Sequence, residues 1–211
     1  MRSTEEETIN AYTHLIWSIL SLVSLMIVLF DERFLLRGKM IFLFMIFLPC
    51  WTFFSSFLYH SSKTAKLKER NRLVDKAAIY LMIVGCGTAI NLSCHDDLVA
   101  ATSSCLLILL GGVFTAALCI RKKTTEVFSV VSYVLLGWAA VFPAFGVFGE
   151  NDYISTSSLS LLIAGGIAYS IGLGFYSRDA VKWNHTWWHV MVMIGFTLQL
   201  TACTRVLVLL Y

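Results

Sequence analysis

Charged residues are scarce in this chain. Of its 211 residues, 14% are Asp, Glu, Lys or Arg and 58% are hydrophobic, whereas a soluble domain has about 25% charged residues. So few polar side chains cannot cover a globule that faces water on all sides. The composition therefore excludes a soluble protein and indicates one compact domain of an integral membrane protein.

Several other sequence signals are also missing. The six cysteines show no C-x-x-C spacing and five of them lie in apolar runs, so we expect buried apolar side chains rather than a disulfide or a thiolate metal site. The opening segment MRSTEEETIN is polar and acidic, unlike the start of a cleavable signal peptide. We therefore expect the first apolar run to act as its own insertion signal.

What the chain has instead is seven apolar runs, each near the length of about 20 residues that a helix needs to cross the hydrocarbon. The third run is the shortest, and the connections between the runs are short. These features predict an all-α integral membrane protein, a seven-helix antiparallel bundle without a soluble domain. The predicted spans are residues 11–30, 40–60, 76–92, 98–120, 127–148, 157–176 and 186–210.

The distribution of Lys and Arg predicts how the bundle is oriented, because positive residues gather in cytoplasmic loops. With a cytoplasmic amino terminus, twelve of the sixteen lie on the cytoplasmic side. We therefore expect the N-terminus to be cytoplasmic and the C-terminus to be outside. The twelve are Arg2, Lys63, Lys66, Lys68, Arg70, Arg72, Lys76, Arg121, Lys122, Lys123, Arg178 and Lys182.

Two better-known classes of seven-helix protein do not fit this pattern. A retinal protein needs a lysine in its last helix to form the Schiff base, and residues 186–210 contain none. A G-protein-coupled receptor has its amino terminus outside, opposite to the predicted orientation. Both classes are excluded.

Three imidazoles and a carboxylate lie at the predicted cytoplasmic ends of the spans. His60 ends the second span, Asp75 opens the third, and His185 and His189 open the seventh. Residues i and i+4 share a helix face, so the last two can turn toward one point. Each residue alone has an ordinary explanation, such as an interfacial aromatic belt or an ion pair at a helix start. The predicted location of all four residues at one membrane face favours a shared site.

Neutral imidazoles suit a divalent metal, and three protein ligands with one open position are typical of catalytic zinc. We therefore predict that His60, His185 and His189 bind Zn²⁺, a donor set that nickel, cobalt and iron also accept. Zinc lowers the pKa of a bound water toward about 7. Asp75 is predicted to orient that water and take its proton. Ser56, one turn before His60, is predicted to hydrogen-bond the water or a developing oxyanion.

Two further polar positions are candidates for supporting roles. Asn10 and His14 form another i, i+4 pair at the start of the first span, and we expect them to orient a metal ligand through hydrogen bonds. The alternative is a helix cap beside a solvated histidine. Gln199 lies deep in the seventh span and is expected to bond a neighbouring helix rather than a substrate.

The order of these motifs resembles the hemolysin III proteins, the related progestin and adipoQ receptors and, more remotely, the alkaline ceramidases. The resemblance covers essentially the whole chain and is closest to the compact bacterial-type branch. It rests on S-x-x-x-H at Ser56 and His60, on Asp75, and on H-x-x-x-H at His185 and His189. Two looser motifs agree: an opening similar to E-E-x-x-N-x-x-T-H with one more residue in the spacing, and R-x-x-D followed by I-Y. Their residues are Glu6, Glu7, Asn10, Thr13 and His14, and Arg72, Asp75, Ile79 and Tyr80.

The resemblance implies a seven-helix fold with zinc held by three histidines near the cytoplasmic face of a bacterial inner membrane. Some relatives hydrolyse ceramide-like amides, others are described as hormone receptors, and bacterial members carry a hemolysin label with roles in membrane homeostasis. This chain departs from the pattern around Asp75. Lys76 stands where many relatives have a second histidine, and GCGTAIN replaces the usual G-T-x-T-P run. A lysine there is expected to favour the charged carboxylate and lower its basicity.

Three functions follow as hypotheses. The first is a zinc-dependent hydrolase that takes a lipid amide or ester from the bilayer, with membrane lipids as its partners and neither nucleic acid nor a soluble partner. The second is a non-enzymatic sensor of the membrane, or a protein of membrane homeostasis, in which zinc is structural. The third, pore formation, is disfavoured because no span has a regular polar stripe to line a channel.

Overall fold

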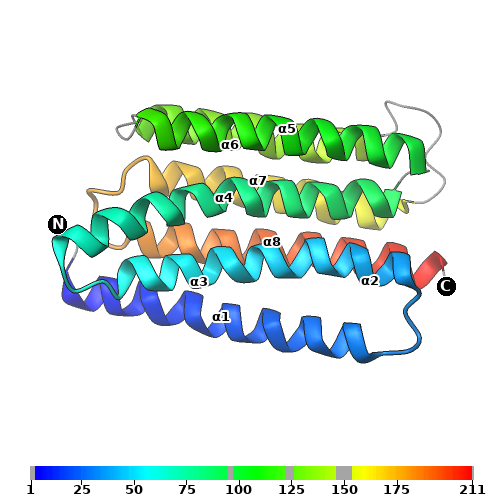
Figure 1. Cartoon of the computed structure of the whole chain (residues 1–211), viewed down its shortest axis with the longest axis horizontal. Coiled ribbons are helices and arrows are strands. Elements are labelled where there is room, and N and C mark those ends of the chain that lie inside the picture. Colours follow the sequence, from blue (N-terminus) through cyan, green and yellow to red (C-terminus); the bar gives the residue numbers. More distant parts are fainter. Residues whose placement is uncertain (1–2, 95–96, 122–125, 146–153, 211) are drawn as a thin grey trace.

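The computed structural model describes residues 3–94, 97–121, 126–145 and 154–210, and within these ranges the chain is helical with no strand. Seven helical segments of the described residues, some made of two or three consecutive elements, are long and apolar enough to cross a membrane, which confirms the predicted fold class. The two termini lie at opposite ends of the bundle (Figure 1). Which end is cytoplasmic stays a prediction. The elements are α1 (Thr4–Phe30), α2 (Leu36–Phe42), η1 (Leu43–Phe47), α3 (Leu48–His60), α4 (Ala65–Cys94), α5 (Asp97–Arg121), α6 (Glu126–Val141), η2 (Phe142–Phe145), α7 (Thr156–Tyr176) and α8 (Asn184–Leu210).

Helix α4 lies at the centre of the bundle. It packs against α3, α5, α6 and α8, and 72% of its most apolar stretch is buried, compared with 28% in α1 and 22% in α5. Figure 1 shows α5 and α6 along one side of the bundle and α1 along the other. Because α1 and α5 bury so little, most of their apolar side chains are left to face lipid.

The helix that contains the predicted third span, residues 76–92, extends well beyond that apolar run. It begins at Ala65, and its 30 residues make α4 the longest helix in the described ranges. The added turns are rich in Lys, Glu and Arg, which are good helix formers without being apolar, so hydropathy alone does not reveal them. Residues 146–148 of the predicted fifth span, and Arg2, Lys122 and Lys123 of the charge tally, lie outside the described residues.

The second span is continuous from Leu36 to His60 but contains a π-helical turn, η1. Pro49 follows this turn at the start of α3, and because proline has no N–H and its ring crowds the carbonyl four residues earlier, a regular α-helix is disfavoured there. The turn lies directly against α4, since a Cβ atom on Gly85 would be 2.7 Å from the carbonyl oxygen of Phe44. After this turn α3 continues as an α-helix to His60.

Candidate metal centre

The three predicted histidine ligands meet at the amino-terminal end of the bundle. His60 is the last residue of α3, and His185 and His189 lie in the first turns of α8. Their exposed fractions are 4%, 4% and 1%. One donor nitrogen from each ring lies within 4.8 Å of the others. The bundle therefore buries three imidazoles from two distant stretches of sequence at one point.

His60 and His185 bring two ring nitrogens close enough to share a proton or a metal ion. His60 Nε2 and His185 Nε2 are 3.1 Å apart, while the Nδ1 atoms face carboxylates: His60 Nδ1 is 2.7 Å from Glu7 Oε2, and His185 Nδ1 is 3.0 Å from Asp179 Oδ1. An ionised carboxylate only accepts hydrogen bonds, so each neutral ring carries its proton on Nδ1 and a lone pair on Nε2. Two lone pairs at this distance repel each other unless a proton or a metal ion lies between them.

The geometry of the cluster fits a metal ion. Tetrahedral zinc with bonds of about 2.0–2.1 Å holds its ligand nitrogens about 3.3 Å apart, near the observed 3.1 Å between His60 and His185. A carboxylate on the far nitrogen of a ligating histidine fixes the tautomer and raises the basicity of the ligand, and two of the three rings have one. The cluster can therefore hold a divalent ion of the kind that prefers imidazole.

The two carboxylates are the part of the site that sequence reasoning missed. Glu7 lies in the second turn of α1, and its other oxygen is 2.8 Å from Lys68 Nζ on α4. Asp179 lies in the connection between α7 and α8. The signal for Glu7 was present in the E-E motif at the start of the chain. Asp179 belongs to no motif, and only the folded connection brings it to the His185 ring.

Helix α1 also fixes the beginning of α8. Glu6 is held by a capping box with Ser3, and its Oε1 accepts a hydrogen bond of 2.6 Å from the backbone N–H of Trp183. Trp183 has a φ of 67°, in the left-handed region that non-glycine residues avoid. One turn later Asn10 Oδ1 accepts a hydrogen bond of 2.7 Å from Thr186, the residue after His185. Positions 6 and 10 share a helix face, so one face of α1 positions the turn that carries the histidines.

His14 continues the same face of α1 but contacts the cluster in a different way from that expected. Its ring stacks on His189 with the centroids 3.7 Å apart and the planes at 11°. Within the described ranges neither of its ring nitrogens has a hydrogen-bond partner. His14 therefore contacts a candidate ligand by stacking, whereas Asn10 accepts a hydrogen bond from the side-chain hydroxyl of Thr186, the residue after another candidate ligand.

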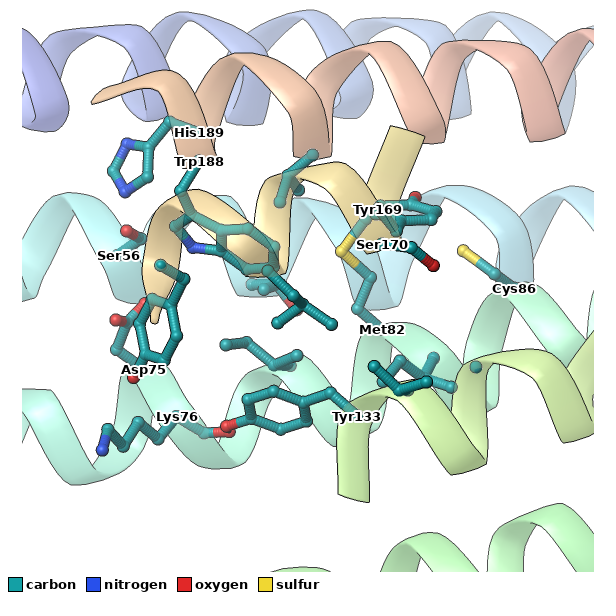
Figure 2. A pocket seen from close by; sticks show the side chains of 18 of the residues that line it. Ser56, Asp75, Lys76, Met82, Cys86, Tyr133, Tyr169, Ser170, Trp188 and His189 are labelled. Atoms are coloured by element: carbon teal, nitrogen blue, oxygen red, sulfur yellow. The ribbon is translucent and has the colours of Figure 1, made fainter. Parts of the chain in front are cut away.

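Asp75 and Ser56 lie on the cavity side of the cluster. Ser56 is on α3, 2% exposed, and Asp75 is half-buried on α4. Both line a cavity that is also lined by His185 and His189, and Figure 2 shows Ser56, Asp75 and His189 at the same end of it. Lys76 lies beside Asp75 at this end and is 8% exposed. Ser56 and Asp75 are thus brought to the cavity side of the histidine cluster, with the buried Lys76 next to Asp75 on α4.

The cavity, of about 100 Å³, runs from the histidine cluster into the bundle between α3, α4, α6, α7 and α8. Its middle is apolar, with Met82, Ile83 and Val192 among the lining residues. A second cleft on the other side of the cluster is lined by Glu7, His60 and the cationic Lys68. The cluster therefore lies between a cavity inside the bundle and a cleft at its amino-terminal end.

Comparison with known proteins identifies the family of the chain. Residues 2–200 match the protein-family model described as Haemolysin-III related. Hemolysin-3 of Bacillus cereus is 29% identical over 203 residues, which cover 90% of this chain and 87% of that protein. The Hemolysin-3 homolog of Bacillus subtilis (strain 168) is 28% identical over 214 residues, which cover 98% of each chain. No solved structure gives a significant match.

Proposed function

Because the chain belongs to the haemolysin-III-related family of multi-pass membrane proteins, we propose that it is a zinc-dependent hydrolase of a lipid amide or ester. The observation that carries the proposal is the pair of Nε2 atoms 3.1 Å apart, each on a ring backed by a carboxylate. Zinc bound at His60, His185 and His189 would polarise a substrate carbonyl and lower the pKa of water toward about 7.

We assign the chemistry around the ion to Asp75 and Ser56. Asp75 accepts the proton of the attacking water and later returns it to the leaving amine or alcohol. It is half-buried and so keeps access to water. Ser56 donates a hydrogen bond to the oxygen of the substrate carbonyl as negative charge develops there.

The substrate is an amphiphile that comes from the bilayer. The apolar middle of the cavity, with Met82, Ile83 and Val192, suits an acyl chain, and the polar end at the histidines suits a carbonyl group. With the basic residues facing the cytoplasm, the reaction takes place at the inner leaflet. Since both relatives come from Bacillus, we assign the chain to the plasma membrane of a bacterium.

Metal content and lipid hydrolysis, measured on the same purified samples, test the proposal. The wild-type protein should carry about one zinc per chain and release free fatty acid from a mixed lipid extract. Alanine at His60, His185 or His189 should abolish both. His95→Ala is the matched control, because the sequence places it in the loop of the opposite membrane face. Turnover that persists in a metal-free His189→Ala protein would refute the proposal.

A structural metal is the second candidate function. It is favoured by the position of the cluster, where α1, α3 and α8 meet through Glu7, His60 and His185. In that case chelation lowers the melting temperature, but Asp75→Asn changes no cellular phenotype. If the protein is a hydrolase, Asp75→Asn should instead lose turnover while it keeps its full metal content. Ion flux through liposomes that contain the protein tests the third possibility, a pore.

A further inference from the structure

The cavity is polar at both of its ends. Near the histidines it is lined by Ser56 and Asp75, and at the opposite end by Tyr169 and Gln199. Figure 2 shows Tyr169, Ser170 and Cys86 far from Ser56 and Asp75, with Met82 between them. A cavity built only for a hydrocarbon tail has no use for hydrogen-bonding groups at the end away from the histidines.

The phenol of Tyr169 is the clearest of these groups. Its hydroxyl is buried and has no hydrogen-bond partner within the described ranges. Its ring is held firmly, because a Cβ atom on Gly195 would be 2.9 Å from two of its carbons. Phenylalanine would fill the same space without burying an unsatisfied hydroxyl, which is costly. A ligand that supplies the missing partner accounts for the hydroxyl.

Gln199 brings an amide to the same place. It lies one turn after Gly195 on α8, on the same helix face, and its Cγ atom packs where a Cβ atom on Gly165 of α7 would be, at 2.9 Å. Ten residues separate it from His189, which corresponds to about 15 Å along the helix. The two polar ends of the cavity are thus separated by the length of a medium-chain acyl group.

From this arrangement we infer that the cavity binds an amphiphile with a polar group at each end of a medium-length acyl chain. One group lies at the histidine cluster, and in this respect the inference rests on the proposed function. The other is an uncharged hydroxyl or carbonyl group that hydrogen-bonds Tyr169 and Gln199. It is uncharged because the residues that line this end carry no charge, and an unpaired ion there would be far too costly.

Binding of lauric acid and ω-hydroxylauric acid tests the inference. The two probes differ only in the terminal hydroxyl, and their affinities can be measured on the purified, zinc-loaded full chain by native mass spectrometry. We expect ω-hydroxylauric acid to bind about tenfold more tightly. Tyr169→Phe and Gln199→Leu should each remove most of that preference. Ser170→Ala is the matched control, because this hydroxyl already accepts from Trp138 Nε1 and donates to the Gly166 carbonyl.

Equal or tighter binding of lauric acid to the wild-type protein would overturn the inference, as would a preference that Tyr169→Phe and Gln199→Leu leave unchanged. The same measurement on His189→Ala separates the two proposals. If the chain proves to be neither metal-bound nor hydrolytic, the preference for the hydroxyl and its dependence on Tyr169 still support the far-end site. An active hydrolase without that preference refutes the far-end site alone.

Discussion

Replacing Glu7 by glutamine tests whether the carboxylate behind His60 strengthens the metal site. Glutamine keeps an oxygen that can accept the Nδ1–H of His60, but it removes the negative charge 2.7 Å from the ring. The side chains of His60 and Glu7 are 0% and 18% exposed, so water screens that charge poorly. Loss of such a carboxylate lowers metal affinity by about 10–100-fold. Because the hydrogen bond survives, we expect about tenfold, or about 1.4 kcal/mol.

Neutralising the second carboxylate, Asp179, should lower metal affinity less than neutralising Glu7. Asp179 is 3.0 Å from His185 Nδ1 and its side chain is 39% exposed, so solvent screens it more and Asp179→Asn should cost only about threefold in affinity. Glu5→Gln is the control. Glu5 is exposed in the first turn of α1, so the variant removes the same charge from the same helix end without touching a histidine.

Zinc affinity can be measured for all four proteins by competition with a coloured chelator, and a melting curve shows that each variant is folded. The expected order of affinity is wild type and Glu5→Gln, then Asp179→Asn, then Glu7→Gln. Wild-type zinc affinity in Glu7→Gln, or a greater loss of affinity in Asp179→Asn than in Glu7→Gln, would refute the reasoning. Either result would mean that the loss of affinity does not depend on how close and how buried the carboxylate is.

Two further predictions concern packing around the site. A Cβ atom on Gly172 would lie 2.8 Å from a Trp188 ring carbon, while nothing lies within 4 Å of one on Gly174. Gly172→Ala should therefore reduce the free energy of unfolding by about 1–3 kcal/mol and lower the melting temperature. Gly174→Ala should leave the melting temperature unchanged. Asn10→Ala removes the hydrogen bond to Thr186 and should cost about 1 kcal/mol of stability. A melting temperature equal to that of the wild type would contradict either expectation.

The membrane spans could be predicted because the hydrocarbon imposes its thickness on any helix that crosses it. The start of α4 could not, because its first turns are helical but polar and no apolar boundary marks Ala65. His60, His185 and His189 could be chosen because the charge pattern placed their helix ends at one face. Their contacts with carboxylates could not be derived, since Asp179 reaches His185 only through the fold of the α7–α8 connection.

The contact partners of the polar residues on α1 could not be predicted either. Its polar positions were recognised as a pair, Asn10 and His14, but pairing on one face does not specify the partner. In the structure Asn10 bonds Thr186, and His14 stacks on His189 without a hydrogen bond. The choice between these contacts depends on how closely α1 approaches α8, which is set by side chains along the whole interface.

The contacts between α1 and α8 determine when the histidine cluster can form during biosynthesis. The groups of the cluster are spread from Glu7 to His189, so most of the chain must leave the ribosome before the ligand set is complete. Until then Glu6, Asn10 and His14 remain without the partners that α8 supplies. Under the proposed function, metal capture would therefore come at the end of insertion, and a chain truncated before α8 would lack two of the three proposed ligands.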